Sequence, residues 1–187
     1  MENLYFLAIT LPETLSQKII EIQEDIANRF KSQASLKIMP HITLKAPFRF
    51  PEDKHESILH WFSDIPVSVE PFQVKLKNFS AFHNKNKPVL YINPEPSSPL
   101  MSLQKQIRDF YQESFPSEKV MNYEVDYHPH LTVAFRDLQP ALFAEAWEKF
   151  KEKDFNESFE VGNFHLLQHQ IKRWQIIRTR MLKGSKL

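Results

Sequence analysis

Pro40-His41-Ile42-Thr43-Leu44 and Pro129-His130-Leu131-Thr132-Val133 are two near-copies of one motif. Each reads proline, histidine, aliphatic, threonine, aliphatic. Because the side chains of a β-strand alternate between its faces, each copy predicts a strand with histidine and threonine on one face and both aliphatic residues on the other. The aliphatic face packs, and the opposite face presents an imidazole beside a hydroxyl. Two such strands facing each other would surround one small anionic centre, which suits acid–base chemistry on a phosphate ester.

The surroundings of the two motifs repeat as well. An apolar strand and then a helical stretch precede each motif, the strand being Leu4–Ile9 in the first copy and Val89–Ile92 in the second. A proline that opens another helix follows each motif, at Pro51 and Pro140. Two copies at this scale indicate an internally duplicated domain and not a solenoid. We predict a single domain over residues 1–187, with halves of approximately 1–85 and 86–182 and a flexible tail over 183–187.

Strands and helices are mixed in both halves, which predicts an α+β or α/β sandwich with antiparallel pairing in two lobes. Residues 115–126 are predicted to form an irregular loop. Strands are predicted over residues 4–10, 40–45, 71–82, 89–93 and 128–136, followed by two closing strands over about 158–169 and 173–182, with a bulge at Gly162.

Composition excludes several classes of protein. The chain has no cysteine, which excludes disulfides, thiol nucleophiles and cysteine–metal sites. Its net charge is +1, so there is no global electrostatic case for nucleic-acid binding. No apolar run approaches the roughly 20 residues that span a bilayer. We expect a cytoplasmic protein with no membrane association and no obligate protein partner. Carboxylates are sparse near the motifs, so we expect no metal and no other cofactor.

Further candidates follow from strand alternation and composition. Lys45 and Arg136 share the predicted face of their motifs and are candidate phosphate ligands, with solvent-facing strand cations as the alternative. His128 shares the face of His130, where it would tune that histidine, hydrogen-bond substrate or be structural. Four aromatic residues are candidates for stacking a base or supporting it, with core packing as the alternative: Phe82, Tyr91, Tyr127 and Trp174.

The residue types of the motifs suit a cyclic phosphodiester. Opening such an ester needs a base to deprotonate the attacking oxygen and an acid to protonate the leaving oxygen. Histidine, with an ordinary pKa of about 6.5, can fill either role near neutral pH. Threonine hydroxyls and nearby cations can hold the non-bridging oxygens. The alternative is a pair of strand histidines capped by threonine hydroxyls. The catalytic interpretation predicts a bell-shaped pH–rate profile around neutrality.

These motifs resemble the signature of the two-histidine (2H) phosphoesterases, and in particular the bacterial enzymes called 2′-5′ RNA ligases or RNA 2′,3′-cyclic phosphodiesterases. Segments Leu4–Phe30, Pro71-Phe72 and Tyr127–His130 also resemble that family, so the likeness spans nearly the whole chain. The resemblance implies a bilobal, pseudo-twofold α+β fold. In it, two mostly antiparallel sheets flank a central cleft, the helices lie outside, and the two motifs face each other.

The resemblance also implies an activity. His41 and His130 would be catalytic, and Thr43 and Thr132 would bind phosphate oxygens. The substrate would be the 2′,3′-cyclic phosphate of an RNA 3′ end or nucleotide, opened without a metal to the 2′-phosphate and reversible as 2′-5′ ligation. One alternative is a small substrate, such as ADP-ribose 1″,2″-cyclic phosphate or a 2′,5′-linked oligonucleotide, which the near-neutral net charge favours. Another alternative is a non-catalytic RNA-end or nucleotide-binding module.

Overall fold

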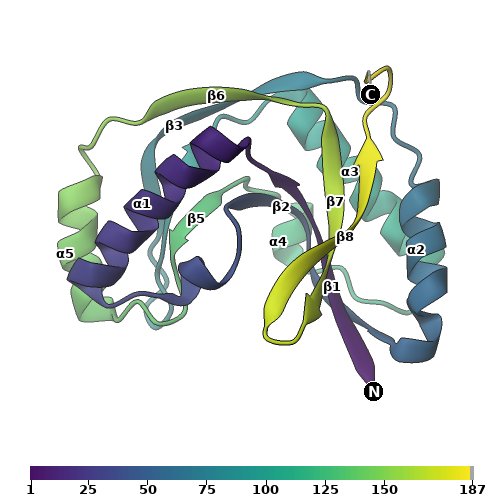
Figure 1. Ribbon diagram of the computed structural model, residues 1–187, viewed down its shortest axis with the longest axis horizontal. Coiled ribbons are helices and arrows are strands. Elements are labelled where there is room, and N and C mark those ends of the chain that lie inside the picture. The colour runs from purple at the N-terminus through teal and green to yellow at the C-terminus, as the bar shows by residue number, and fades with distance from the viewer. Residues whose placement is uncertain (186–187) are drawn as a thin grey trace.

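The computed structural model describes residues 1–185, in which eight strands form two antiparallel four-stranded sheets (Figure 1). The first sheet has the spatial order β2 (His41–Pro51), β1 (Glu2–Thr10), β7 (Asn163–Gln170) and β8 (Arg173–Met181). The second has the order β5 (Leu131–Ala134), β4 (Val89–Pro94), β3 (Phe72–Phe82) and β6 (Asn156–Val161). The predicted α+β class with two antiparallel sheets is therefore confirmed.

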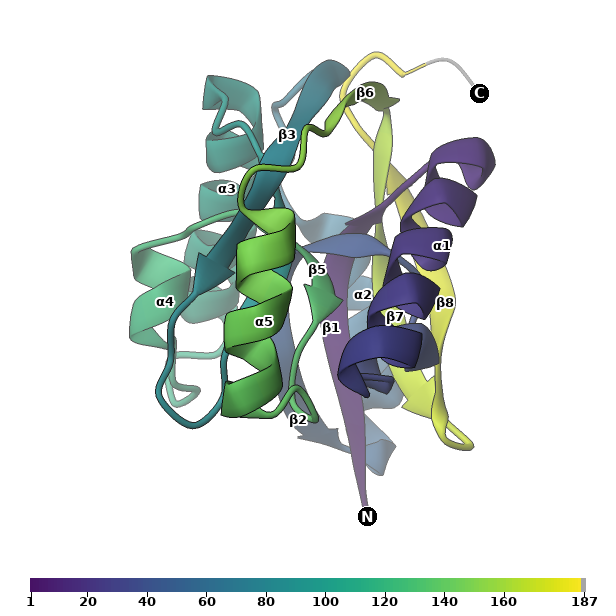
Figure 2. The ribbon, with the colours of Figure 1, turned by 90° about the vertical axis from the view of Figure 1, so that its left-hand side faces the viewer.

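The helices cover the outside of the molecule because each long helix has one apolar face. Helices α1 and α5 lie together on one flank, and α2 and α3 on the other (Figures 1 and 2). On α1, for example, Ile19 and Ile26 are completely buried. The helix bounds are α1 (Glu13–Phe30), α2 (His55–Asp64), α3 (Ser98–Ser114), α4 (Asn122–Val125) and α5 (Pro140–Phe150), with 3₁₀ turns η1 (Ala34–Lys37) and η2 (Glu52–Lys54). Helix α4 falls within the segment that was predicted to be an irregular loop.

The two sheets do not coincide with the two halves of the sequence. Strand β3, from the first half, pairs with β4 and β6, whereas β7 and β8 extend the sheet of β1 and β2. The prediction of one closing strand over residues 158–169 is wrong. The chain divides at Gly162 into β6 and β7, which belong to different sheets. The first half therefore contributes β3 to the sheet that carries the second motif, and the second half contributes β7 and β8 to the sheet that carries the first motif. The internal duplication itself stays a prediction.

Residues after β8 return to the body of the protein. Leu182 is buried, the Lys183 N–H donates to the Val69 carbonyl oxygen at 2.9 Å, and the Ser185 hydroxyl donates to the Gly162 carbonyl oxygen at 2.8 Å. The rest of the predicted flexible tail, residues 186–187, lies outside the described residues. Within residues 1–185 no helix is both long enough and apolar enough to cross a membrane.

Both motifs lie on edge strands, and the two edge strands β2 and β5 contact each other. Each strand also has a β-bulge directly after the motif threonine. On β2, Thr43 and Lys45 pair with the consecutive residues Ala8 and Leu7 of β1. On β5, Thr132 and Ala134 pair with consecutive residues of β4. A bulge turns the residues beyond it to a different face, so the alternation that relates histidine to threonine ends at the threonine.

Candidate active site

A cavity of about 520 Å³ is lined by residues of both motifs. The sequence predicted that His41, Thr43, His130 and Thr132 share one centre, and all four side chains lie around this cavity. They come together because two edge strands from different sheets face each other. The arrangement brings two imidazoles and two hydroxyls within reach of one bound group.

Both imidazoles are held in the same way. His41 Nδ1 lies 2.8 Å from the carbonyl oxygen of Met39, and His130 Nδ1 lies 2.8 Å from the carbonyl oxygen of His128. A carbonyl oxygen can only accept, so Nδ1 carries the proton in each neutral ring and Nε2 keeps its lone pair. In both motifs one proline separates the histidine from its acceptor. These backbone acceptors were not predicted, although the shared proline was the signal for a fixed local geometry.

The packing around the two imidazoles differs. The His41 ring lies 5.1 Å from the ring of Phe6, which in turn contacts Trp174 edge-on at 4.6 Å. Phe6 and Trp174 both line the cavity. The predicted role of Trp174 beside a bound base is therefore compatible with its position.

Phe82, Tyr91 and His128 contact His130 or support it without lining the cavity. The rings of Phe82 and Tyr91 lie 5.2 and 5.8 Å from the ring of His130. The Tyr91 hydroxyl is 2.9 Å from His128 Nε2, and the His128 carbonyl holds His130. The structure thus places these three residues beside His130, where they can fix the ring, which fits the predicted supporting role.

Burial lowers the pKa of both histidines. Burial and, to a smaller extent, the nearby His130 imidazole lower the pKa of His41 to about 4, although the hydrogen bond to the Met39 carbonyl partly offsets the shift. Burial likewise lowers the pKa of His130 below its ordinary value. Both rings are therefore neutral in the free protein at pH 7, and an anionic ligand would favour protonation of one of them.

The two residues predicted to bind phosphate through their positive charge, Lys45 and Arg136, lie in different surroundings. Arg136 lines the cavity, with a left-handed backbone at φ 60° and its guanidinium 5.0 Å from the ring of Phe135. Lys45 does not line the cavity. The bulge turns it into the interior, where its Nζ lies 2.7 Å from Glu124 Oε1 and its side chain is 3% exposed. Its position therefore does not support the prediction that Lys45 binds phosphate.

Tyr127 is also outside the cavity lining. Its hydroxyl donates to the Thr43 carbonyl oxygen at 2.8 Å. This contact fits the predicted supporting role of Tyr127.

Several cavity residues lie outside the two motifs and were not predicted as site residues. Lys37 and Lys172 line the cavity together with Arg136, so three cationic side chains surround it. The carboxylate of Asp137 also lines it, but that group accepts hydrogen bonds from the Ser32 hydroxyl and a backbone N–H, which hold its pKa below the ordinary value. Lys37 lies in the 3₁₀ turn η1 shortly before the first motif, and Lys172 lies in the hairpin turn between β7 and β8, so only the fold brings Lys172 to the cavity.

Two facing edge strands, each with a histidine and a threonine at one cavity, agree with what the resemblance to the two-histidine phosphoesterases implies. A sequence profile described as the 2′-5′ RNA ligase superfamily matches residues 11–173. The chain belongs to this superfamily.

Relatives of the chain agree with this assignment. Two relatives are named "putative phosphoesterase". The one from Geobacillus kaustophilus is 29% identical over 167 residues, covering 87% of this chain and 91% of its own. The one from Bacillus cytotoxicus is 32% identical over 151 residues, covering 80% and 83%.

The fold is similar to that of Escherichia coli LigT complexed with 3′-AMP, with a TM-score of 0.72, 20% identity and coverage of 98% of this chain and 100% of that one. It is also similar to TT0787 of Thermus thermophilus, with a TM-score of 0.67, 18% identity and coverage of 98% and 100%.

Proposed function

We propose that this protein opens the 2′,3′-cyclic phosphate of an RNA end or nucleotide to the 2′-phosphate, without a metal ion. The observation that carries the proposal is the matched pair of imidazoles. Each has its Nδ1 proton committed to a backbone carbonyl, and each lines the same cavity beside a threonine. A pair of this kind supplies one acceptor and, once protonated, one donor to a single phosphorus centre.

The reaction follows from these groups. One imidazole takes a proton at Nε2 from water as the water oxygen bonds to phosphorus. The other imidazole gives a proton to the departing 3′-oxygen as the P–O3′ bond breaks. The threonine hydroxyls and Arg136 stabilise the charge on the non-bridging oxygens. Where the 5′-hydroxyl of a second RNA end replaces water, the same groups would form a 2′-5′ bond: the base takes the proton of the 5′-hydroxyl as its oxygen bonds to phosphorus, and the acid protonates the departing 3′-oxygen. Because acid and base exchange roles in the reverse direction, this step is reversible.

Two features of the cavity support a nucleotide or RNA end as substrate. Trp174 offers an aromatic wall on which an unpaired base can stack. Lys37, Arg136 and Lys172 give the cavity a cationic lining, although the whole chain is nearly neutral. The local charge suits a substrate with phosphates beyond the cyclic one, which favours an RNA end over a mononucleotide. The LigT structure with 3′-AMP shows that a protein of this fold holds a nucleotide.

The test is hydrolysis of a nucleoside 2′,3′-cyclic phosphate and of a short RNA with a 2′,3′-cyclic end, both in excess chelator. Phosphorus NMR identifies the product. We expect turnover of both substrates to 2′-phosphates. A 3′-phosphate product would contradict the assigned leaving group, and loss of activity in chelator would contradict the metal-free mechanism. Binding of the RNA without turnover would indicate a binding module.

The pH dependence of kcat/KM should peak below pH 6.5. The base must be neutral and the acid protonated in the free enzyme, and the pKa values of both imidazoles are lowered from 6.5, that of His41 to about 4. Raising the pH above these values removes the proton from the acid, and lowering the pH protonates the base. The bell therefore moves to the acidic side of the neutral optimum that the sequence predicts. A kcat/KM profile from pH 4 to 9 checks this; a maximum above pH 7 would contradict it.

Thr43→Ala and Thr132→Ala should each weaken turnover without abolishing it. Each removes one hydroxyl at the cavity, a loss of about 1–3 kcal/mol of transition-state stabilisation, or roughly 5- to 150-fold in kcat/KM. Thr43→Ser and Thr132→Ser are matched controls that keep the hydroxyl and should retain most activity. Equal loss in the alanine and serine variants would assign these residues a packing role.

A further inference from the structure

A buried ion pair joins the two parts of the chain that carry the motifs. Lys45 Nζ on β2 lies 2.7 Å from Glu124 Oε1 on α4, and the two side chains are 3% and 4% exposed. The same carboxylate oxygen accepts a hydrogen bond from the Ala46 N–H at 3.2 Å. Because separating a buried ion pair leaves an uncompensated charge, these contacts fix α4 firmly against β2.

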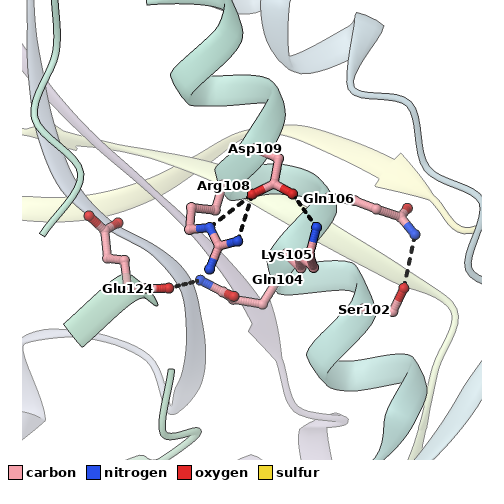
Figure 3. Close-up of polar contacts among 7 residues, drawn as sticks. All are labelled: Ser102, Gln104, Lys105, Gln106, Arg108, Asp109 and Glu124. Carbon is pink, nitrogen blue, oxygen red and sulfur yellow. Dashed lines mark hydrogen bonds and ion pairs between the residues drawn. The ribbon is translucent and has the colours of Figure 1, made fainter. Parts of the chain in front are cut away.

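The carboxylate and backbone of Glu124 also fix α4 on its other sides. Glu124 Oε2 accepts a hydrogen bond from the Met121 N–H at 3.0 Å. Its backbone carbonyl accepts one at 2.9 Å from Nε2 of Gln104, a buried residue of α3 (Figure 3). Both carboxylate oxygens and the carbonyl oxygen are thus engaged, so this four-residue helix has a defined position on both β2 and α3.

A hydrogen bond from Tyr127 also joins the two parts of the chain, closer to the motifs. The Tyr127 hydroxyl donates to the carbonyl oxygen of Thr43, the threonine of the first motif, at 2.8 Å. Burial raises the pKa of Tyr127 above its ordinary value, so the phenol keeps the proton that it donates. Tyr127 precedes His130 by three positions. The bond therefore ties the chain that leads to one histidine to the strand that carries the other.

The second motif strand is also held from the opposite side by the first half of the chain. Gln23 Nε2 on α1 donates to the Thr132 carbonyl oxygen at 3.2 Å, and the Ser35 hydroxyl donates to the Val133 carbonyl oxygen at 2.9 Å. An edge strand leaves backbone groups unpaired by its own sheet. On β2 and β5, side chains from the other half of the chain satisfy some of these carbonyls close to the catalytic residues.

We propose that Glu124 and Tyr127 are positioning residues, which set the separation of His41 and His130 by bonding the approach to the second motif onto β2. Two imidazoles that act on one phosphorus must be placed to within about 0.5 Å, and the sheets that carry them share no backbone ladder between β2 and β5. The catalytic consequence rests on the proposed function, but the positions of the imidazoles can be measured without substrate.

Tyr127→Phe tests the proposal with the smallest change, since it removes only the hydroxyl. We expect kcat for a nucleoside 2′,3′-cyclic phosphate to fall roughly ten- to a hundredfold, with a much smaller change in KM. Tyr123→Phe is the matched control on the same segment, because Tyr123 is 59% exposed. It should leave kcat unchanged. Assays run well below the melting temperature of each variant keep the folded fraction constant.

The double variant Lys45→Met/Glu124→Gln tests the ion pair without leaving one buried charge. Methionine can keep the packing against Tyr111, whose ring lies 4.3 Å from Lys45 Nζ. Glutamine has one acceptor oxygen where the carboxylate has two, so it cannot accept from both the Ala46 and Met121 N–H groups. We expect a folded protein with lowered kcat.

Histidine side-chain NMR titrations supply a readout that does not depend on turnover. In Tyr127→Phe, the imidazole chemical shifts and pKa values of His41 and His130 should change, whereas the chemical shifts of the exposed His60 ring should not. If the wild type turns over no cyclic phosphate, the proposed function fails and this titration still decides the positioning role. Wild-type kcat and unchanged titrations in both folded variants would overturn the inference. Activity lost only in proportion to the unfolded fraction would overturn it too.

Discussion

His41→Ala and His130→Ala should each lower kcat by roughly 10²–10⁴-fold. The proposed reaction needs a base and an acid in one step, and each variant removes one of them. Both imidazoles line the same cavity with Nδ1 bonded to a backbone carbonyl, and each lies beside the threonine of its own motif. His169 also lines the cavity but belongs to neither motif, so we do not expect it to replace a missing imidazole. The measurement is the steady-state kcat on a nucleoside 2′,3′-cyclic phosphate at the pH optimum of the wild type.

The double variant sharpens this expectation. Residues that act as a unit have non-additive effects, so His41→Ala/His130→Ala should be little worse than either single variant. His60→Ala, which changes an exposed histidine on α2 outside the cavity lining, is the matched control and should retain wild-type kcat. Near-wild-type turnover in either single variant would exclude the two-histidine mechanism.

Local periodicity explains what could be predicted from the sequence. Histidine and threonine two residues apart on a strand must share a face, and this holds before any tertiary contact is known. The gathering of His41, Thr43, His130 and Thr132 around one cavity follows from that periodicity and the repetition of the motif. The antiparallel α+β class likewise follows from the mixture of short strands and amphipathic helices.

The features that could not be predicted depend on pairing between distant segments. Strand alternation predicts that Lys45 lies on the same face as Thr43. The bulge on β2 instead pairs Thr43 and Lys45 with consecutive residues of β1, which turns the lysine inward. No local pattern distinguishes a bulged strand from a regular one without its partner β1. In the same way, the apolar pattern continues across Gly162 and predicts a single strand, although β6 and β7 belong to different sheets. Lys172 lines the cavity from a hairpin turn whose place is set only by the folded chain.

Lys45→Met alone should lower the free energy of unfolding by about 3–5 kcal/mol. Removing the ammonium group leaves the Glu124 carboxylate buried without its counter-charge, and the remaining Ala46 and Met121 N–H donors do not neutralise it. The measurement is chemical denaturation at pH 7, followed by circular dichroism. The matched control is Lys77→Met, which breaks the exposed pair of Lys77 and Glu95, 3.8 Å apart, and should cost at most about 1 kcal/mol.

Adding Glu124→Gln to Lys45→Met should recover most of the lost stability, because the buried charge is then removed together with its partner. The double variant would then show that the effect on stability differs from the effect on catalysis. The double variant is expected to be nearly as stable as the wild type but still impaired in kcat, since one backbone hydrogen bond of the Glu124 carboxylate is lost. A Lys45→Met variant no less stable than Lys77→Met would show that the pair contributes little to folding. Full recovery of both stability and kcat in the double variant would mean that the pair fills space between α4 and β2 without setting the positions of the histidines.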